Sequence, residues 1–189
     1  ETDAIVVGSG ISGGWAAKEF CEKGFKTLVI ERGRMVKHVE DYPTMNKDPW
    51  DMKNGGRSSQ EALKDYNKQR RWGVNEGNRH FYNKDSEYDY DEDKPFDWIR
   101  GTQVGGRSLI WGRQTYRWSD DDFEANLRDG IAVDWPVRYK EIAPWYSYVE
   151  KFIGVSGEPL NLPHLPDSVF LPAMELNCVE KELRNSITK

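Results

Sequence analysis

The first thirty residues contain two short apolar runs with a longer amphipathic segment between them. Residues Ala4–Val7 and Thr27–Ile30 are rich in β-branched side chains, a composition typical of parallel strands that are buried on both faces of a sheet. Residues 11–21 carry apolar side chains at helical spacing, and Gly24 supplies a helix stop. We therefore expect a strand, a helix and a second strand, with the first strand central in its sheet.

After residue 38 the pattern changes. Between Asp41 and Asp97, Leu63 and Val74 are the only leucine, valine or isoleucine residues, whereas aromatic side chains are frequent. This segment cannot build an aliphatic core, so we predict an aromatic and charged insertion at about 39–97. One polar helix is expected over 59–71. The aromatic rings of the insertion are predicted to pack within the protein more often than to form a carbohydrate-binding surface or an oligomer contact.

The remainder of the chain has a helical pattern. Ser119 is a typical N-cap for a helix running to about Arg128, and a second helix should start near Arg138 and be kinked or restarted by Pro144. The proline-rich residues 154–172 predict an extended connection. A last apolar stripe predicts a packing helix and consists of Leu176, Val179, Leu183 and Ile187.

Composition narrows the range of functions. The 189 residues include 27 basic and 32 acidic side chains, and this net charge of −5 gives no general attraction for nucleic acid. No apolar run approaches the roughly 18 residues of a membrane span. Neither Cys21 nor Cys178 lies in a C-x-x-C motif or at a metal-binding spacing from a histidine. Both are therefore predicted to be buried free thiols. Only two clear strands are present where a dinucleotide-binding sheet has five or six, so we expect the chain to be a fragment.

The turn between the first strand and the helix has the spacing G-x-G-x-x-G at Gly8, Gly10 and Gly13. In dinucleotide-binding folds these glycines allow a tight turn, close approach of a pyrophosphate and close packing of helix on strand. Backbone N–H groups near Ser12 would face the anion at the helix start. Glu31 follows the second strand, where a carboxylate binds the hydroxyls of an adenosine ribose. This pattern does not separate NAD from FAD.

A second informative stretch, RGTQVGGRSLIWGRQTYRW, runs from Arg100 to Trp118. Gly105 and Gly106 allow the backbone to approach a flat ligand, and a short helix starting within residues 107–112 could point its amides at the same pyrophosphate. The alternative from spacing alone is a tight turn before a buried segment.

Taken together, the motifs resemble the N-terminal part of the glucose-methanol-choline (GMC) oxidoreductases, flavoenzymes that oxidise alcohols and sugars. The resemblance rests on VVGSGISGG at 6–14, VIERG at 29–33 and RGxxVGGxSxxWG at 100–112. It implies FAD rather than NAD, and it is strongest to the bacterial sugar-oxidising branch with glycoside 3-dehydrogenases and gluconate dehydrogenases. Related pyranose oxidases carry a flavin-linked histidine where this chain has Ile110 before Trp111, so FAD is expected to be non-covalent.

The resemblance implies an α/β fold, a Rossmann-like FAD-binding domain with an incomplete sheet over residues 1–118, and a helical continuation over 119–189. It implies no catalytic residue in this chain, because the family's base is a late histidine, so the fragment by itself should be inactive. His38, His80 and His164 are expected to have surface or packing roles, and no metal ligands are predicted. The predicted cofactor residues are Gly8, Gly10, Ser12, Gly13, Glu31, Arg32, Arg100, Val104, Gly105, Gly106, Ser108, Trp111 and Gly112.

Two alternatives to an FAD-dependent sugar or polyol oxidoreductase stay open. One is an NAD-dependent dehydrogenase, which the first motif alone would permit, and the other is a nucleotide-binding module without catalysis. The resemblance implies a sugar or polyol substrate, a small subunit and a cytochrome electron acceptor as partners. It favours the periplasm over the cytoplasm.

Overall fold

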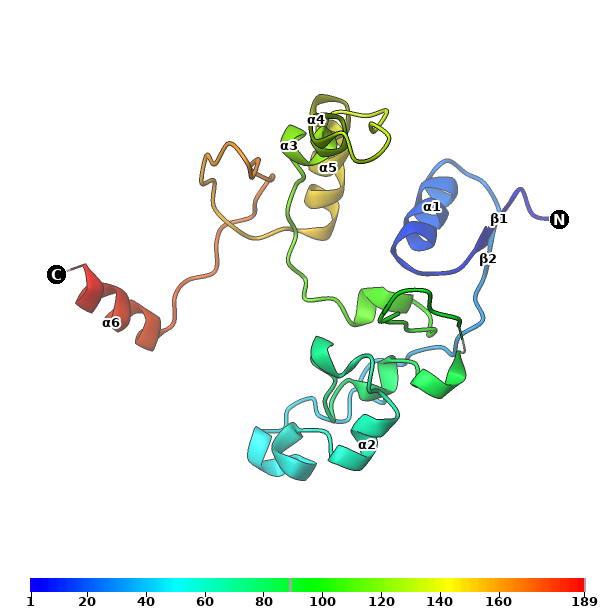
Figure 1. Ribbon diagram of the computed structural model, residues 1–189, viewed down its shortest axis with the longest axis vertical. Coiled ribbons are helices and arrows are strands. Elements are labelled where there is room, and N and C mark those ends of the chain that lie inside the picture. The colour runs from blue at the N-terminus through cyan, green and yellow to red at the C-terminus, as the bar shows by residue number, and fades with distance from the viewer. Residues whose placement is uncertain (89, 189) are drawn as a thin grey trace. The chain divides into compact units, whose positions relative to one another are not determined.

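The computed structural model describes residues 1–88 and 90–188. The chain forms two compact units, residues 1–112 and residues 113–189 (Figure 1). The first unit holds β1 (Ala4–Val7), α1 (Ile11–Glu22), β2 (Thr27–Ile30) and α2 (Gln60–Lys64). It also holds short 3₁₀ turns at 49–51 and 53–56, before α2, and at 70–72, 79–81, 85–87 and 106–109, after it. The second unit holds α3 (Asp120–Phe123), α4 (Ala125–Asp129), α5 (Tyr139–Ile153) and α6 (Cys178–Ile187).

The predicted strand, helix and strand are confirmed at the N-terminus. β1 and β2 pair in parallel, with Ala4 opposite Thr27 and Val7 opposite Ile30, and α1 connects them. The helix ends at Glu22, and Gly24 follows with φ of +86°. A left-handed residue stops a helix and turns the chain back toward the sheet.

The prediction that both strands are buried on both faces is wrong for the described residues. Val6 is buried, but Val7 is 82% exposed, and Ile5 and all of Leu28–Ile30 are exposed as well. Among the described residues β1 and β2 form a two-stranded sheet, so no further strand or helix covers the outer faces and edges. The predicted burial of both cysteines is wrong for a similar reason, because α1 and α6 each leave their cysteine on an uncovered face.

The insertion builds a small aromatic core. Tyr66, Val74 and Tyr82 are buried together, and Ile99 and Ile110 pack against them. The predicted single helix over 59–71 is wrong. The Ser59 hydroxyl accepts a hydrogen bond from Ala62 N and caps α2, but α2 ends at Lys64. Turns then bring the side chains of Tyr66 and Gln69 into the interior.

The second unit is helical, as predicted, with three changes. Ser119 caps α3 in a capping box with Asp122, yet the predicted helix to Arg128 is split at Glu124, whose φ and ψ are −96° and −3°. α5 begins after Arg138 and continues through Pro144 without a restart. The α6 stripe is exposed in the described chain and does not pack as predicted.

A buried ion pair organises the second unit. The Arg117 guanidinium donates to both carboxylate oxygens of Glu150 on α5, at 2.8 and 2.6 Å, and Glu150 is 1% exposed. Arg117 also donates to Tyr139 and Ser147. Val169 N donates to Glu150 Oε2 at 2.8 Å, which fastens the segment after α5.

The predicted extended connection over 154–172 is instead a loop closed on itself. Leu171 N donates to Val155 O at 2.7 Å, and the Ser156 hydroxyl donates to Pro172 O at 2.8 Å. Proline removes backbone donors but does not prevent such isolated pairings at the ends of a loop. Across the described residues, no helix has the length and apolar character needed to cross a bilayer.

Candidate functional site

The turn between β1 and α1 brings the three motif glycines together. Gly8 adopts φ of +90°, a left-handed conformation that glycine accepts without steric cost, and Gly8 N donates to Ile30 O at 2.7 Å. A Cβ on Gly13 would lie 1.9 Å from Gly8 O and 3.3 Å from the Val6 side chain. The third glycine is therefore required by the packing of α1 against β1.

Gly10 differs from Gly13 because no described residue occupies the space where its Cβ would lie. A Cβ on Gly10 would meet no atom within 4 Å. Gly10 is the N-cap of the 12-residue α1, with no capping side chain and no acidic residue in the first turn. Unpaired N–H groups at a helix start attract anions. The described residues thus leave both space and hydrogen-bond donors at the start of α1, where the motif predicts a pyrophosphate.

Glu31 lies at the centre of the hydrogen bonds around this turn. Its Oε2 accepts from Ser9 N at 2.8 Å and from the Ser9 hydroxyl at 2.7 Å, and its Oε1 accepts from Gly33 N at 3.0 Å. These donors, led by the Ser9 backbone N–H, lower the pKa of Glu31 to about 2. The carboxylate is consequently ionised at neutral pH and fixed at the end of β2.

The second motif is attached to the first through Ser9. Gly105 N donates to the Ser9 hydroxyl at 3.0 Å, so one hydroxyl links the second motif to Glu31. A Cβ on Gly106 would lie 3.4 Å from Gly10 Cα. Val104 N donates to Arg34 O at 2.9 Å. Two stretches about 90 residues apart in sequence therefore border the same turn.

The remaining predicted residues occupy different places. Ser12 is exposed in the first turn of α1, and the Ser108 hydroxyl donates to Gly105 O at 2.6 Å within the 3₁₀ turn over 106–109. Trp111 and Gly112 are exposed at the end of the first unit. Arg32 and Arg100 approach the ring of Tyr88. Sequence reasoning missed Ser9 and Tyr88; the hydroxyl in the middle of G-S-G was the available signal for Ser9.

The three histidines are placed as expected for packing or surface roles. His80 Nε2 lies 2.7 Å from Asp41 O, and its ring is 4.1 Å from that of Phe81. His38 and His164 are exposed. Over the residues that the structure describes, no three histidine, cysteine, aspartate or glutamate side chains group as metal ligands.

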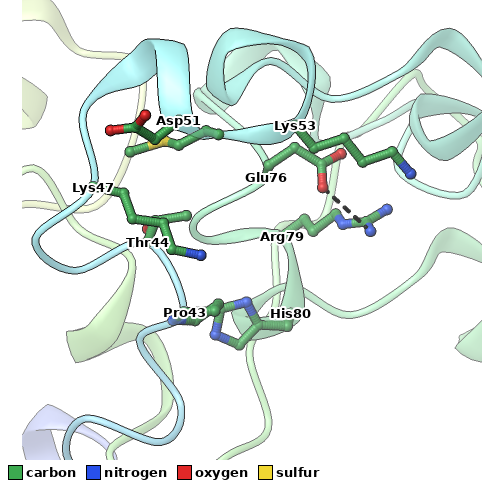
Figure 2. Close-up of a pocket in the computed structure, with 9 residues that line it drawn as sticks. Pro43, Thr44, Lys47, Asp51, Lys53, Glu76, Arg79 and His80 are labelled. Atoms are coloured by element: carbon green, nitrogen blue, oxygen red, sulfur yellow. Dashed lines mark ion pairs between the residues drawn. The ribbon is translucent and has the colours of Figure 1, made fainter.

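A separate pocket of about 410 Å³ lies within the insertion (Figure 2). Its charged lining mixes signs, and the Arg79 guanidinium lies 3.4 Å from a Glu76 carboxylate oxygen. None of the predicted cofactor residues lines it. The lining residues are Pro43, Thr44, Lys47, Asp51, Met52, Lys53, Glu76, Arg79 and His80.

Comparison with known proteins identifies oxidoreductases as relatives, although no family model matches the chain. The chain is 25% identical to 2-methyl-1,2-propanediol dehydrogenase from Mycolicibacterium austroafricanum, over 88% of this chain and 27% of the relative. It is 26% identical to 6'''-hydroxyparomomycin C oxidase from Streptomyces lividus, over 82% of this chain and 23% of the relative. It is 24% identical to the fructose dehydrogenase large subunit from Gluconobacter japonicus, over 82% of this chain and 27% of the relative.

These relatives are dehydrogenases and oxidases of the GMC type, so the resemblance predicted from the motifs is confirmed. The chain spans about a quarter of the length of the curated relatives that it matches. One solved structure, pyridoxine 4-oxidase from Mesorbium loti, aligns with 98% of this chain and 31% of its own, at 18% identity and a TM-score of 0.46.

Proposed function

We propose that this chain is the cofactor-binding part of an FAD-dependent oxidoreductase that acts on a CH–OH group of a sugar, glycoside or polyol. The observation that carries the proposal is the hydrogen bond from Gly105 N to the Ser9 hydroxyl, which itself donates to Glu31 and so joins the two motifs around one turn. A nicotinamide site needs only the first motif. The names of the relatives, among them 2-methyl-1,2-propanediol dehydrogenase and the fructose dehydrogenase large subunit, support an alcohol or sugar substrate.

In this proposal the first unit is the beginning of a Rossmann-like domain. The N–H groups of the first turn of α1 would bind the pyrophosphate, and Gly10 would let the backbone approach it. Glu31 would accept hydrogen bonds from the ribose hydroxyls through the carboxylate lone pairs that are not used by Ser9 and Gly33. Residues 104–106 would lie nearer the flavin, followed by Ser108, Trp111 and Gly112. FAD, when bound, supplies the acceptor for the hydride that leaves the alcohol carbon.

The chain's own residues contribute binding and orientation rather than proton transfer. None of the three histidines lies among the predicted cofactor residues, and Glu31, whose pKa is held at about 2, is a poor base at neutral pH. We propose that the base belongs to another part of the whole protein. A small subunit is a further proposal, supported by the relative named as a large subunit.

The identity of the nucleotide tests the proposal. The protein is purified without added cofactor and denatured, and the released compound is identified by its absorption spectrum and by chromatography against FAD and NAD standards. We expect FAD, released without proteolysis because it is non-covalent. Oxidation of fructose and 2-methyl-1,2-propanediol with an artificial electron acceptor is then measured. Release of NAD, or no nucleotide and no affinity for added FAD, would overturn the assignment.

A further inference from the structure

Tyr88 lies beside two of the predicted cofactor residues. The guanidinium carbon of Arg32, just after β2, is 5.0 Å from the centre of the Tyr88 ring. The guanidinium carbon of Arg100, at the start of the second motif, is 4.4 Å from the same ring and 3.4 Å from the Trp98 ring. Cations within about 6 Å of an aromatic ring are attracted by its quadrupole. One tyrosine of the insertion therefore contacts an arginine from each motif.

The insertion fixes Tyr88 relative to the second motif. Asn83 is buried; its N–H donates to Arg100 O at 3.0 Å, and its side-chain amide donates to the Thr102 hydroxyl at 3.1 Å. The same amide donates to Glu87 Oε2 at 2.7 Å, in the 3₁₀ turn that immediately precedes Tyr88. The ring position is thus set by the folded insertion.

Neither guanidinium group forms an ion pair with a carboxylate of the described residues. Within residues 1–88 and 90–188, no carboxylate lies within ion-pair distance of Arg32 or Arg100. Glu31, the neighbour of Arg32, accepts hydrogen bonds from Ser9 and Gly33 instead. Two like charges that contact one ring lie within about 10 Å, close to one Debye length at physiological salt. Their mutual repulsion favours an anion bound near both.

We propose that Arg32 and Arg100 form an oxyanion clamp for the phosphate groups of a nucleotide, and that Tyr88 is the positioning residue that holds the clamp together. The inference deepens the proposed function and rests on it. Arginine is suited to this role because its planar fork matches phosphate oxygens and its flat face stacks on aromatic rings. It also gives the insertion a specific task, namely to join the ends of the two motifs.

The test measures nucleotide affinity at two ionic strengths in the whole protein. The variants are Tyr88→Leu, Tyr88→Phe and Arg32→Gln, with Tyr116→Leu as a matched control, since Tyr116 is an exposed tyrosine in the other unit. FAD, ADP and adenosine are the probes, each by equilibrium titration. Tyr88→Leu should weaken FAD and ADP by roughly tenfold and reduce the salt dependence of their affinity. Tyr88→Phe, Tyr116→Leu and all adenosine titrations should match the wild type.

A double-mutant comparison of positions 32 and 88 distinguishes a positioning role of Tyr88 from a general structural role. Arg32→Gln, a change to an exposed side chain, should weaken ADP less in the Tyr88→Leu background than in the wild type. Equal ADP affinity and salt dependence in wild type and Tyr88→Leu would overturn the clamp. An equal loss for adenosine, or loss with Tyr88→Phe, would also overturn it. A wild type that binds ADP but not FAD would overturn the flavin assignment and leave the clamp supported.

Discussion

Replacing Glu31 with glutamine should destabilise the first unit in a manner that depends on pH. Glutamine keeps the size of the side chain but replaces one accepting oxygen with an amide that donates. The carboxylate accepts three hydrogen bonds, two from Ser9 and one from Gly33 N. The variant must lose at least one of these bonds, because both carboxylate oxygens accept and the amide nitrogen of glutamine cannot accept.

The pKa of Glu31 gives the magnitude and the sign. A fall from 4.5 to about 2 corresponds to roughly 3 kcal/mol at about 1.36 kcal/mol per pKa unit, and solvent screening of this incompletely buried group reduces the contribution to about 1–2 kcal/mol. The folded-state pKa lies below the unfolded value. The stabilisation is therefore fully present above pH 4.5 and is lost as pH falls toward 2.

Urea unfolding followed by circular dichroism between pH 7 and pH 3 measures this difference. Glu31→Gln should lower the free energy of unfolding by about 1–2 kcal/mol at pH 7, and the gap to wild type should narrow as the pH falls. Glu40→Gln is the matched control, because the Glu40 carboxylate forms an exposed ion pair with Lys37. A gap of the same size at pH 7 and pH 3 would refute the assignment of an ionised, hydrogen-bonded carboxylate.

Two further changes test the packing of each unit. Gly13→Ala should prevent α1 from packing, because its Cβ would lie 1.9 Å from Gly8 O; wild-type-like thermal unfolding of this variant would contradict the packing argument. Glu150→Gln should destabilise the second unit by roughly 3–5 kcal/mol, since it leaves the buried Arg117 without its ion-pair partner. Chemical denaturation measures this, and a loss below about 1 kcal/mol would show that the pair is solvated.

Local patterns in the sequence predicted the elements with short-range causes. β1 and β2 match their predicted bounds because β-branched runs and the glycine turn specify them. The sequence also predicted correctly that Ser119 caps the helix that follows it. The split at Glu124 was not predicted, because no glycine or proline in the sequence marks that position.

Burial and long-range contacts were beyond the sequence pattern. Apolar runs indicate what a strand would bury, but they do not indicate whether a neighbour covers Val7 or Leu28. The contact of Gly105 with Ser9, and that of Tyr88 with both arginines, joins residues far apart in sequence. Spacing alone gives no signal for such pairs, so the motifs predict a set of cofactor residues but not the contacts that hold these residues in place.

The affinity of Gly10→Val for FAD, measured by equilibrium dialysis, tests the central claim most directly. The structure leaves the space beside Gly10 free of protein atoms within 4 Å, so the variant should keep the circular dichroism and thermal unfolding of the wild type. Because valine would fill the space through which the backbone meets the pyrophosphate, we predict that FAD binding is abolished. A folded Gly10→Val protein that retains a full complement of FAD would contradict the account.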